Sequence, residues 1–104
     1  MSFRSLIRFN VKPGKEAEFE AAFDKAGMLR RPKRIAGFID AELVRSIGDP
    51  VEYFVVGRWE SEQAYADWQT VSQAEAPPDA LATLSDVLTD RMPGRLFAPV
   101  ARSD

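Results

Sequence analysis

One segment in the middle of the chain predicts a strand that is apolar on both of its faces. Residues 51–59 have the β-branched and aromatic composition of a strand, and Tyr53-Phe54-Val55-Val56 forms its centre. Because successive side chains of a strand point to opposite faces of a sheet, this strand needs cover on both sides. A chain of 104 residues that contains it must supply or recruit a layer for each face of a sheet.

Three other segments also predict strands. Residues 3–11 alternate with period two, residues 37–46 form a second candidate, and residues 95–101 form the last. Gly48-Asp49-Pro50 is a turn signal, so residues 37–46 and 51–59 are expected to form an antiparallel hairpin. The chain thus offers enough strands for one sheet.

Helical periodicity occurs between these strands. Residues 16–29 and residues 61–73 each carry an apolar stripe at helical spacing, and Ser61 is a favourable N-cap for the second. Asp79 is expected to cap a third helix, which Pro93-Gly94 ends. The stripes consist of Phe19, Ala22, Phe23 and Ala26 in the first helix and of Ala64, Tyr65, Trp68 and Val71 in the second.

The order of these elements, β-α-β-β-α-(α)-β, is the ferredoxin-like α+β pattern, a sandwich in which helices cover one face of a four-stranded sheet. Residues 1–104 are expected to form one domain, with a core over about residues 3–101 and a short C-terminal tail. Leu6, Phe54 and Val56 fall on the face that the helices leave open. Two such sheets packed face to face would bury them, so a homodimer is expected.

Composition excludes several classes of function. The formal charge is −2, with 14 basic and 16 acidic residues, so nothing favours nucleic-acid binding. The absence of Cys and His excludes disulfides, thiolate and imidazole metal sites, and Cys- or His-dependent catalysis. Asp40 and Glu42 share a strand face without a third ligand, so no metal site is expected. No membrane span or signal-peptide core is present, so a cytoplasmic location is expected.

Several motifs occur in the order and spacing of one known family. The run Arg58-Trp59-Glu60-Ser61-Glu62-Gln63-Ala64-Tyr65, followed by Trp68, is the most specific of them. The others are Val11-Lys12-Pro13-Gly14-Lys15-Glu16-Ala17-Glu18-Phe19, Gly37-Phe38, Arg45-Ser46 and Asp49-Pro50. With these motifs the chain resembles the antibiotic biosynthesis monooxygenase (ABM) family over about residues 3–100.

The resemblance implies a dimeric α+β barrel with a pocket between the sheet and the helices of each subunit. Many family members use O2 without metal, flavin or haem to oxidise aromatic polyketide phenols or anthrones to quinones, so no cofactor is expected. Other branches oxidise quinols, degrade haem or have signalling-related roles. In the quinone-forming branch, the Trp and the Tyr of the last motif belong to the pocket, and they match Trp59 and Tyr65.

Two departures from the family patterns bear on the reaction. A quinone-forming relative has an Asn four residues before the Trp, where this chain has Val55, so a polar anchor for the substrate is absent. The haem-degrading branch uses an Asn where Ile7 aligns and a His after the second helix, and this chain has no His. The resemblance therefore favours an aromatic substrate other than haem.

The candidate pocket combines aromatic walls with two hydrogen-bond donors. Trp59 ends a strand and Tyr65 lies at the start of the next helix, so both are expected to reach one cavity as catalytic donors to a substrate anion. A deprotonated phenol or anthrone can pass an electron to O2, so the partners would be O2 and a small aromatic, polyketide-like molecule. The expected substrate-binding walls are Ile7, Phe9, Phe23, Tyr53, Val55 and Trp68.

Other interpretations of the same residues stay open. Trp59, Tyr65 and Trp68 are also typical core aromatics, which would leave a non-catalytic dimeric domain. A scavenger of quinols or reactive aldehydes is a related possibility. An aromatic polyketide cyclase or a binding protein would use the same pocket without redox chemistry.

Charged residues give weaker hypotheses. Arg8 and Arg58 fall on the open face of the sheet, where Asp40 or Glu42 could pair with them. The basic segment before the second strand is either a solvated loop or a path that steers an anionic substrate to the pocket. This segment contains Arg30, Arg31, Lys33 and Arg34.

Overall fold

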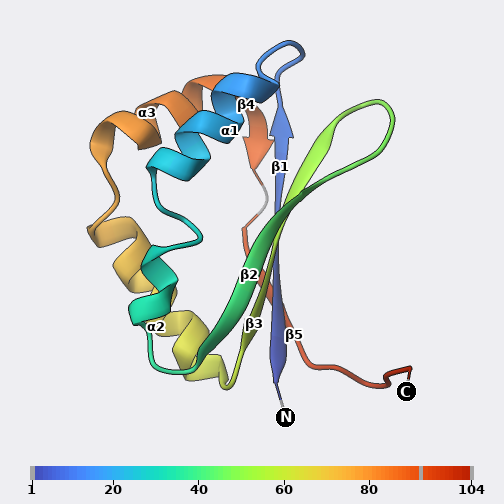
Figure 1. Cartoon of the computed structure of the whole chain (residues 1–104), viewed down its shortest axis with the longest axis vertical. Coiled ribbons are helices and arrows are strands. Elements are labelled where there is room, and N and C mark those ends of the chain that lie inside the picture. Colours follow the sequence, from blue (N-terminus) through green and yellow to red (C-terminus); the bar gives the residue numbers. More distant parts are fainter. Residues whose placement is uncertain (1, 92, 104) are drawn as a thin grey trace.

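The structure, a computed structural model, describes residues 2–91 and 93–103 (Figure 1). Its strands are β1 (Phe3–Val11), β2 (Phe38–Arg45), β3 (Glu52–Trp59), β4 (Leu88–Arg91) and β5 (Arg95–Phe97). Its helices are α1 (Glu16–Lys25), the 3-10 helix η1 (Arg31–Arg34), α2 (Glu62–Ala74) and α3 (Pro78–Val87). Asp104, the end of the predicted tail, lies outside the described residues. The order of elements confirms the ferredoxin-like α+β fold and adds one strand, β4.

The strands form one antiparallel sheet in the order β2-β3-β1-β4, with β5 also beside β1. The longest ladder joins β1 to β3, from the pair Phe3–Trp59 to the pair Asn10–Glu52. Since β1 and β2 are both antiparallel to β3, they are parallel to each other, and α1 is the crossover of a split β-α-β unit. The predicted hairpin of β2 and β3 is confirmed.

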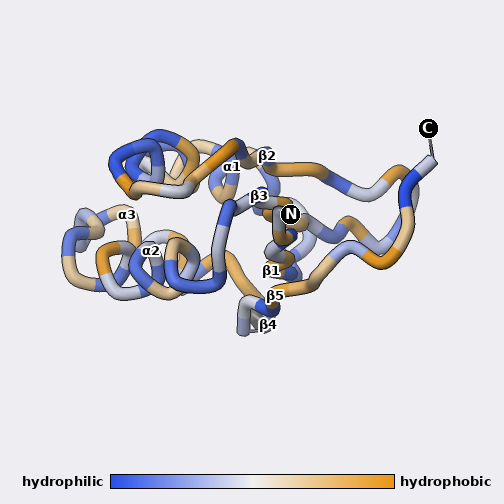
Figure 2. The backbone as a smooth tube through the Cα atoms, turned by 90° about the horizontal axis from the view of Figure 1, so that it is seen from below, coloured by the Kyte–Doolittle hydropathy of each residue, from blue (hydrophilic) through white to orange (hydrophobic). Residues whose placement is uncertain are grey.

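The helices lie together on one side of the sheet (Figure 1 and Figure 2). The β2–β3 loop and the segment after β5 project on the opposite side, and each carries a fully exposed apolar side chain, Ile47 and Val100. Leu6 and Val44 are exposed on the open face of the sheet, at 36% and 37%. Within residues 2–91 and 93–103, no helix has the length and apolar character needed to cross a membrane.

Buried side chains between the sheet and the helices form two clusters. The α1 cluster consists of Phe9, Val11, Phe19, Ala22, Phe23, Ala26, Tyr53, Ala80, Leu84 and Val87. The α2 cluster consists of Trp59, Ala64, Tyr65 and Trp68. Met28, which follows α1, is partly buried and packs against both clusters. The inward face of β3 therefore runs from one cluster at Tyr53 to the other at Trp59.

Four element ends differ from the sequence prediction. α1 ends at Lys25 rather than at residue 29, because Gly27 adopts a φ of +70°, which is left-handed. Asp79 lies inside the first turn of α3 and is not its N-cap. α3 ends at Val87, and residues 88–91 pair with β1 as β4 instead of continuing the helix. β5 covers only the first three residues of the predicted last strand.

Ion pairs lie on the open face of the sheet. Arg58 Nε donates to Oδ1 of Asp40 at 2.8 Å, and its Nη2 contacts the other carboxylate oxygen. This hydrogen bonding from Arg58 lowers the pKa of Asp40. Arg8 instead pairs with Glu52, at 2.9 Å. The predicted pairing with Asp40 or Glu42 is thus confirmed for Arg58 and wrong for Arg8.

Candidate active site

Trp59 and Tyr65, the two predicted catalytic residues, meet in the α2 cluster. Their rings contact edge to face, with centroids 5.5 Å apart and planes at 62°. Trp59 ends β3 and is 2% exposed, and Tyr65 lies near the start of α2 and is 6% exposed. Ser61 caps α2 as predicted, because its Oγ accepts the Ala64 N–H at 3.1 Å. The strand end and the capped helix start bring the predicted pair together.

The indole N–H of Trp59 is already bonded within the protein. It donates to Oγ of Ser5 on β1 at 2.9 Å, in a buried bond between neighbouring strands. Gly57 leaves room for this bond, since a Cβ atom there would lie 2.6 Å from Ser5 Oγ and 2.9 Å from Trp59 Nε1. The sequence analysis did not identify Ser5 as a site residue. Its one distinguishing feature in the sequence is that it is a small polar residue at an inward position of a strand. The Trp59 donor is therefore engaged before any substrate binds.

The hydroxyl of Tyr65 is buried and has no hydrogen-bond partner among the described residues. It lies against Gly94, where a Cβ atom would collide with it and would come 3.0 Å from Cγ1 of Ile7. Burial raises the pKa of Tyr65, and the nearby side chain of Gln69 offsets part of the rise. The phenol is therefore a donor at neutral pH. An unpaired buried donor costs about 1–3 kcal/mol, which a ligand that accepts its hydrogen bond would offset.

Trp68 extends the α2 cluster and carries a cation over its ring. The guanidinium carbon of Arg31 lies 5.1 Å from the ring centroid, within the range of a cation–π interaction. The other basic residues of this segment are exposed, and two of them, Arg30 and Arg34, form surface ion pairs. The segment thus forms η1 rather than the predicted loop, its basic side chains are mostly solvated, and Arg31 packs on the candidate site.

A second polar group, which we call the Glu20 centre, lies at the other end of β3. Tyr53, 1% exposed, donates its hydroxyl to Oε2 of Glu20 on α1 at 2.5 Å, and Nη1 of Arg45 on β2 lies 3.4 Å from the same oxygen. Burial, followed by this hydrogen bond, raises the pKa of Tyr53. Sequence reasoning identified Tyr53 only as a wall and missed Glu20 and Arg45, because folding alone joins these three elements.

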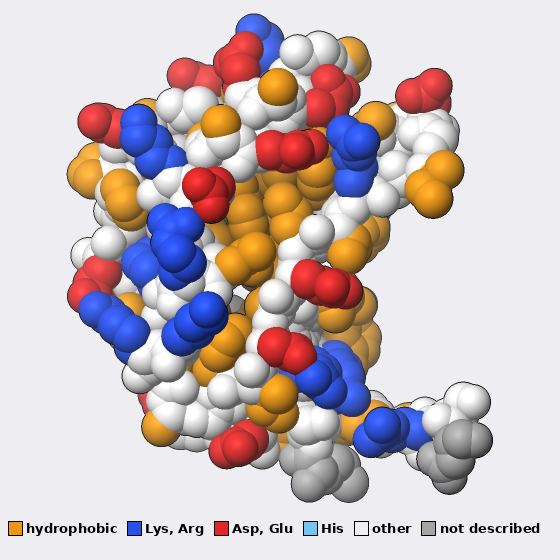
Figure 3. Space-filling view, in the orientation of Figure 1, with side chains coloured by type: hydrophobic (Ala, Val, Ile, Leu, Met, Phe, Trp, Pro, Cys, Tyr) orange, Lys and Arg blue, Asp and Glu red, His pale blue; other side chains and the backbone are white. Residues whose placement is uncertain are grey.

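The remaining predicted walls divide between buried and partly buried positions. Phe9 and Phe23 are buried in the α1 cluster with ring centroids 6.3 Å apart, whereas Ile7 and Val55 are partly buried against it. Figure 3 shows an apolar hollow between the helical layer and the sheet, which we call the central hollow. The incomplete burial of Ile7 and Val55 agrees with a gap in the packing between the two clusters.

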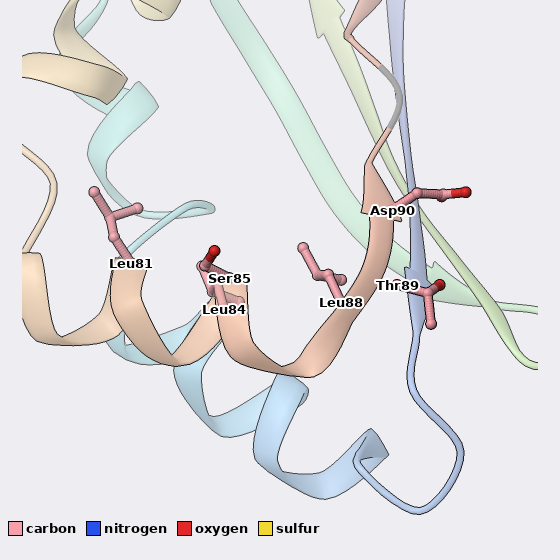
Figure 4. Close-up of a pocket in the computed structure, with 6 residues that line it drawn as sticks. All are labelled: Leu81, Leu84, Ser85, Leu88, Thr89 and Asp90. Carbon is pink, nitrogen blue, oxygen red and sulfur yellow. The ribbon is translucent and has the colours of Figure 1, made fainter.

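Two clefts lie at the margins of the molecule, and neither is lined by Trp59 or Tyr65. One, of about 540 Å³, adjoins the Glu20 centre and is lined by Glu16, Arg45, Ser46, Ile47, Gly48 and Val51. The other, of about 380 Å³, is lined by Leu81, Leu84, Ser85, Leu88, Thr89 and Asp90. Figure 4 shows Asp90 directed away from the leucines of this second cleft, and Asp90 accepts a hydrogen bond from Asn10 at 2.7 Å. Charged groups that could bind a ligand therefore adjoin the first cleft.

The sequence matches the model of one known family. That model is described as antibiotic biosynthesis monooxygenase and matches residues 2–76. The matched part runs from β1 to α2 and includes Trp59, Tyr65 and Trp68. No curated protein matches the sequence significantly.

Solved structures share the fold at low sequence identity. SnoaB, a cofactor-independent oxygenase from Streptomyces nogalater, is 23% identical with a TM-score of 0.68, over 97% of this chain and 95% of that chain. Rv0793 from Mycobacterium tuberculosis is 19% identical with a TM-score of 0.71, over the whole of both chains. A dimeric ferredoxin-like protein from an uncultured marine organism is 15% identical with a TM-score of 0.76, over 99% of this chain and 91% of that chain. These similarities establish the ferredoxin-like fold.

Proposed function

This chain belongs to the antibiotic biosynthesis monooxygenase family, and we propose that it is a cofactor-independent oxygenase that converts an aromatic phenol or anthrone-type molecule to a quinone with O2. The observation that carries the proposal is the buried Tyr65 hydroxyl without a described partner, beside Trp59 in the α2 cluster. The structural similarity to SnoaB, a cofactor-independent oxygenase, supports this class of reaction. An aromatic polyketide is the substrate class that we propose.

The proposed substrate is acidic and rich in electrons, so the protein need not carry a redox centre. Loss of a proton from the methylene of an anthrone gives an anion, which passes one electron to O2. The resulting radical and superoxide combine at that carbon, and loss of water from the hydroperoxide leaves a carbonyl. One atom of O2 thus enters the quinone and the other leaves as water. The protein has to bind a flat apolar molecule, stabilise its oxyanion and exclude water.

Tyr65 is the hydrogen-bond donor in this proposal. Its protonated hydroxyl bonds to the anionic oxygen of the substrate or to the peroxide, whereas Trp59, held by Ser5, forms a flat wall. Because Ile7 and Gly94 pack beside the hydroxyl, the partly buried Ile7 has to change its rotamer when the substrate binds. The other proposed walls are Phe9, Phe23, Tyr53, Val55 and Trp68.

We also propose that the chain acts as a homodimer. The open face of the sheet presents apolar side chains, and two further apolar side chains stand on the segments that project beyond it. A second copy packed on this face would cover both sets. These side chains are Leu6, Val44, Phe54 and Val56 on the sheet, and Ile47 and Val100 on the projecting segments.

Oxygen uptake with emodin anthrone, measured with metal-stripped protein, tests the proposed reaction. Tyr65→Phe removes only the buried hydroxyl and is expected to lower the rate by about 100-fold, as for the loss of one oxyanion donor. Thr70→Val is the matched control, because it removes a hydroxyl from the exposed face of the same helix. Uptake no faster than in buffer, or an unchanged rate in Tyr65→Phe, would contradict the proposal.

A parallel assay under argon separates oxidation from the alternative functions. An aromatic polyketide cyclase or a binding protein would use the same apolar layer without redox chemistry, and the unpaired donor of Tyr65 is sufficient for either. Ring closure with loss of water and no added oxygen atom would favour the cyclase. Tight binding with unchanged recovery of the molecule would favour the binding protein.

A further inference from the structure

The Glu20 centre has free hydrogen-bonding capacity. Oε2 of Glu20 accepts from Tyr53 at 2.5 Å and from Arg45 at 3.4 Å, whereas Oε1 receives no hydrogen bond from the residues that the structure describes. The two oxygens of a carboxylate together offer about four acceptor sites, so Oε1 can accept a further bond. The Glu20 side chain is 48% exposed, which leaves this oxygen within reach of a ligand.

The position of the Glu20 centre sets a length for the guest. The Tyr65 hydroxyl lies beside Ile7, which pairs with Val55 on β3. Tyr53, the partner of Glu20, is two residues from Val55 on the same face, at about 7 Å along the strand. A flat apolar guest with more than one ring is therefore long enough to contact both Tyr65 and Glu20.

The surroundings of the Glu20 centre favour a particular chemical group. The cleft of about 540 Å³ brings solvent to Arg45 and Val51, and Val51 also packs against the α1 cluster. Figure 3 shows acidic and basic side chains facing each other across the rim of the central hollow. A carboxylate already paired with a cation repels a second anion and accepts a hydrogen bond from a neutral donor. A phenolic hydroxyl meets this requirement, and a carboxylate or phosphate does not.

We propose that Glu20 binds a hydroxyl on the terminal ring of the guest that is remote from Tyr65, while Tyr53 and Arg45 hold the carboxylate in place. The preferred guest is then a linear, multi-ring aromatic that is hydroxylated at one end. This inference rests on the proposed function, which places the guest in the apolar layer. It adds that Glu20 determines which aromatic molecule binds there.

Two quinones test this inference by binding alone. Emodin and chrysophanol are three-ring anthraquinones that differ by one hydroxyl on a terminal ring, and both are already oxidised. Quenching of tryptophan fluorescence measures their Kd, and the wild-type protein is expected to bind emodin about tenfold or more tightly than chrysophanol. Glu20→Ala is expected to abolish this preference, because it weakens the binding of emodin and leaves the binding of chrysophanol unchanged. Glu18→Ala, a matched change at an exposed position of the same helix, is expected to retain it.

The chrysophanol affinity shows whether Glu20 acts directly. A purely structural role for Glu20 would weaken both quinones equally and would overturn the inference. Equal affinity of the wild-type protein for the two quinones, or binding of neither, would also overturn it. Oxygen uptake is a separate readout. Oxygen uptake without a preference for emodin would support the proposed function and overturn this inference. A preference for emodin without oxygen uptake would support this inference and contradict the proposed function.

Discussion

The two tyrosines of the chain are both buried, but their hydroxyls have different surroundings. Tyr53 donates to Glu20 at 2.5 Å, whereas Tyr65 has no partner among the described residues. Burial is the largest cause of the raised pKa of each. The folded chain therefore holds both protons more tightly than the unfolded chain. The stability of the fold is therefore fully present below about pH 10, and part of it is lost as the pH rises through the folded pKa of each phenol.

The free energy of unfolding is therefore expected to fall above about pH 10. The decline is expected to be shallower in Tyr65→Phe, because Phe has no phenol that ionises in the unfolded chain. Urea unfolding at about pH 9 and about pH 11 measures this difference. Thr70→Val, which retains both tyrosines, should decline as the wild-type protein does. Equal declines in Tyr65→Phe and the wild-type protein would contradict the raised pKa of Tyr65.

At the scale of elements, the start of α2 positions the candidate donor. Ser61 Oγ accepts the Ala64 N–H at 3.1 Å, and Tyr65 follows directly on the capped turn. Ser61→Ala is expected to lower the free energy of unfolding by about 1 kcal/mol, whereas Ser61→Asp retains an N-cap acceptor and should cost much less. Urea unfolding at neutral pH measures both. An equal loss in the two variants would show that the hydroxyl does not act as a cap.

Elements with clear periodicity were predictable, and those defined by long-range pairing were not. The stripes of α1 and α2 and the alternation of β1 gave their positions to within a few residues. β4 follows α3 without an intervening Gly or Pro, and Leu88 continues the apolar stripe of α3, so only pairing with β1 makes residues 88–91 a strand. The site divides in the same way. Trp59 and Tyr65 are close along the chain, whereas Ser5 and Glu20 reach their partners only through the folded sheet.

At the scale of the whole molecule, the helices supply only one of the two layers that β3 requires. The inner face of β3 buries Tyr53 and Trp59 at 1% and 2% exposure. Phe54 and Val56 on the outer face remain only partly buried within one chain. The pair of Arg58 and Asp40 lies on this outer face and is about half exposed, so it adds charge without covering the apolar positions. The outer apolar face of β3 thus lacks cover within one chain, and a second copy of the chain would supply it.

Light scattering is therefore expected to give a mass twice the 11.6 kDa of the chain. Leu6→Glu is expected to yield a monomer, because the two-fold symmetry of a homodimer would replace two apolar contacts of the interface with two carboxylates, whose desolvation disfavours association. Ala82→Glu places the same charge on the exposed side of α3 and should leave the mass unchanged. A wild-type monomer at micromolar concentration, or a Leu6→Glu dimer, would show that the outer face of the sheet is not the interface. The helical layer, with Trp59 and Tyr65, lies on the other face of the sheet, so Leu6→Glu should retain the near-UV circular dichroism of these aromatic residues even as a monomer.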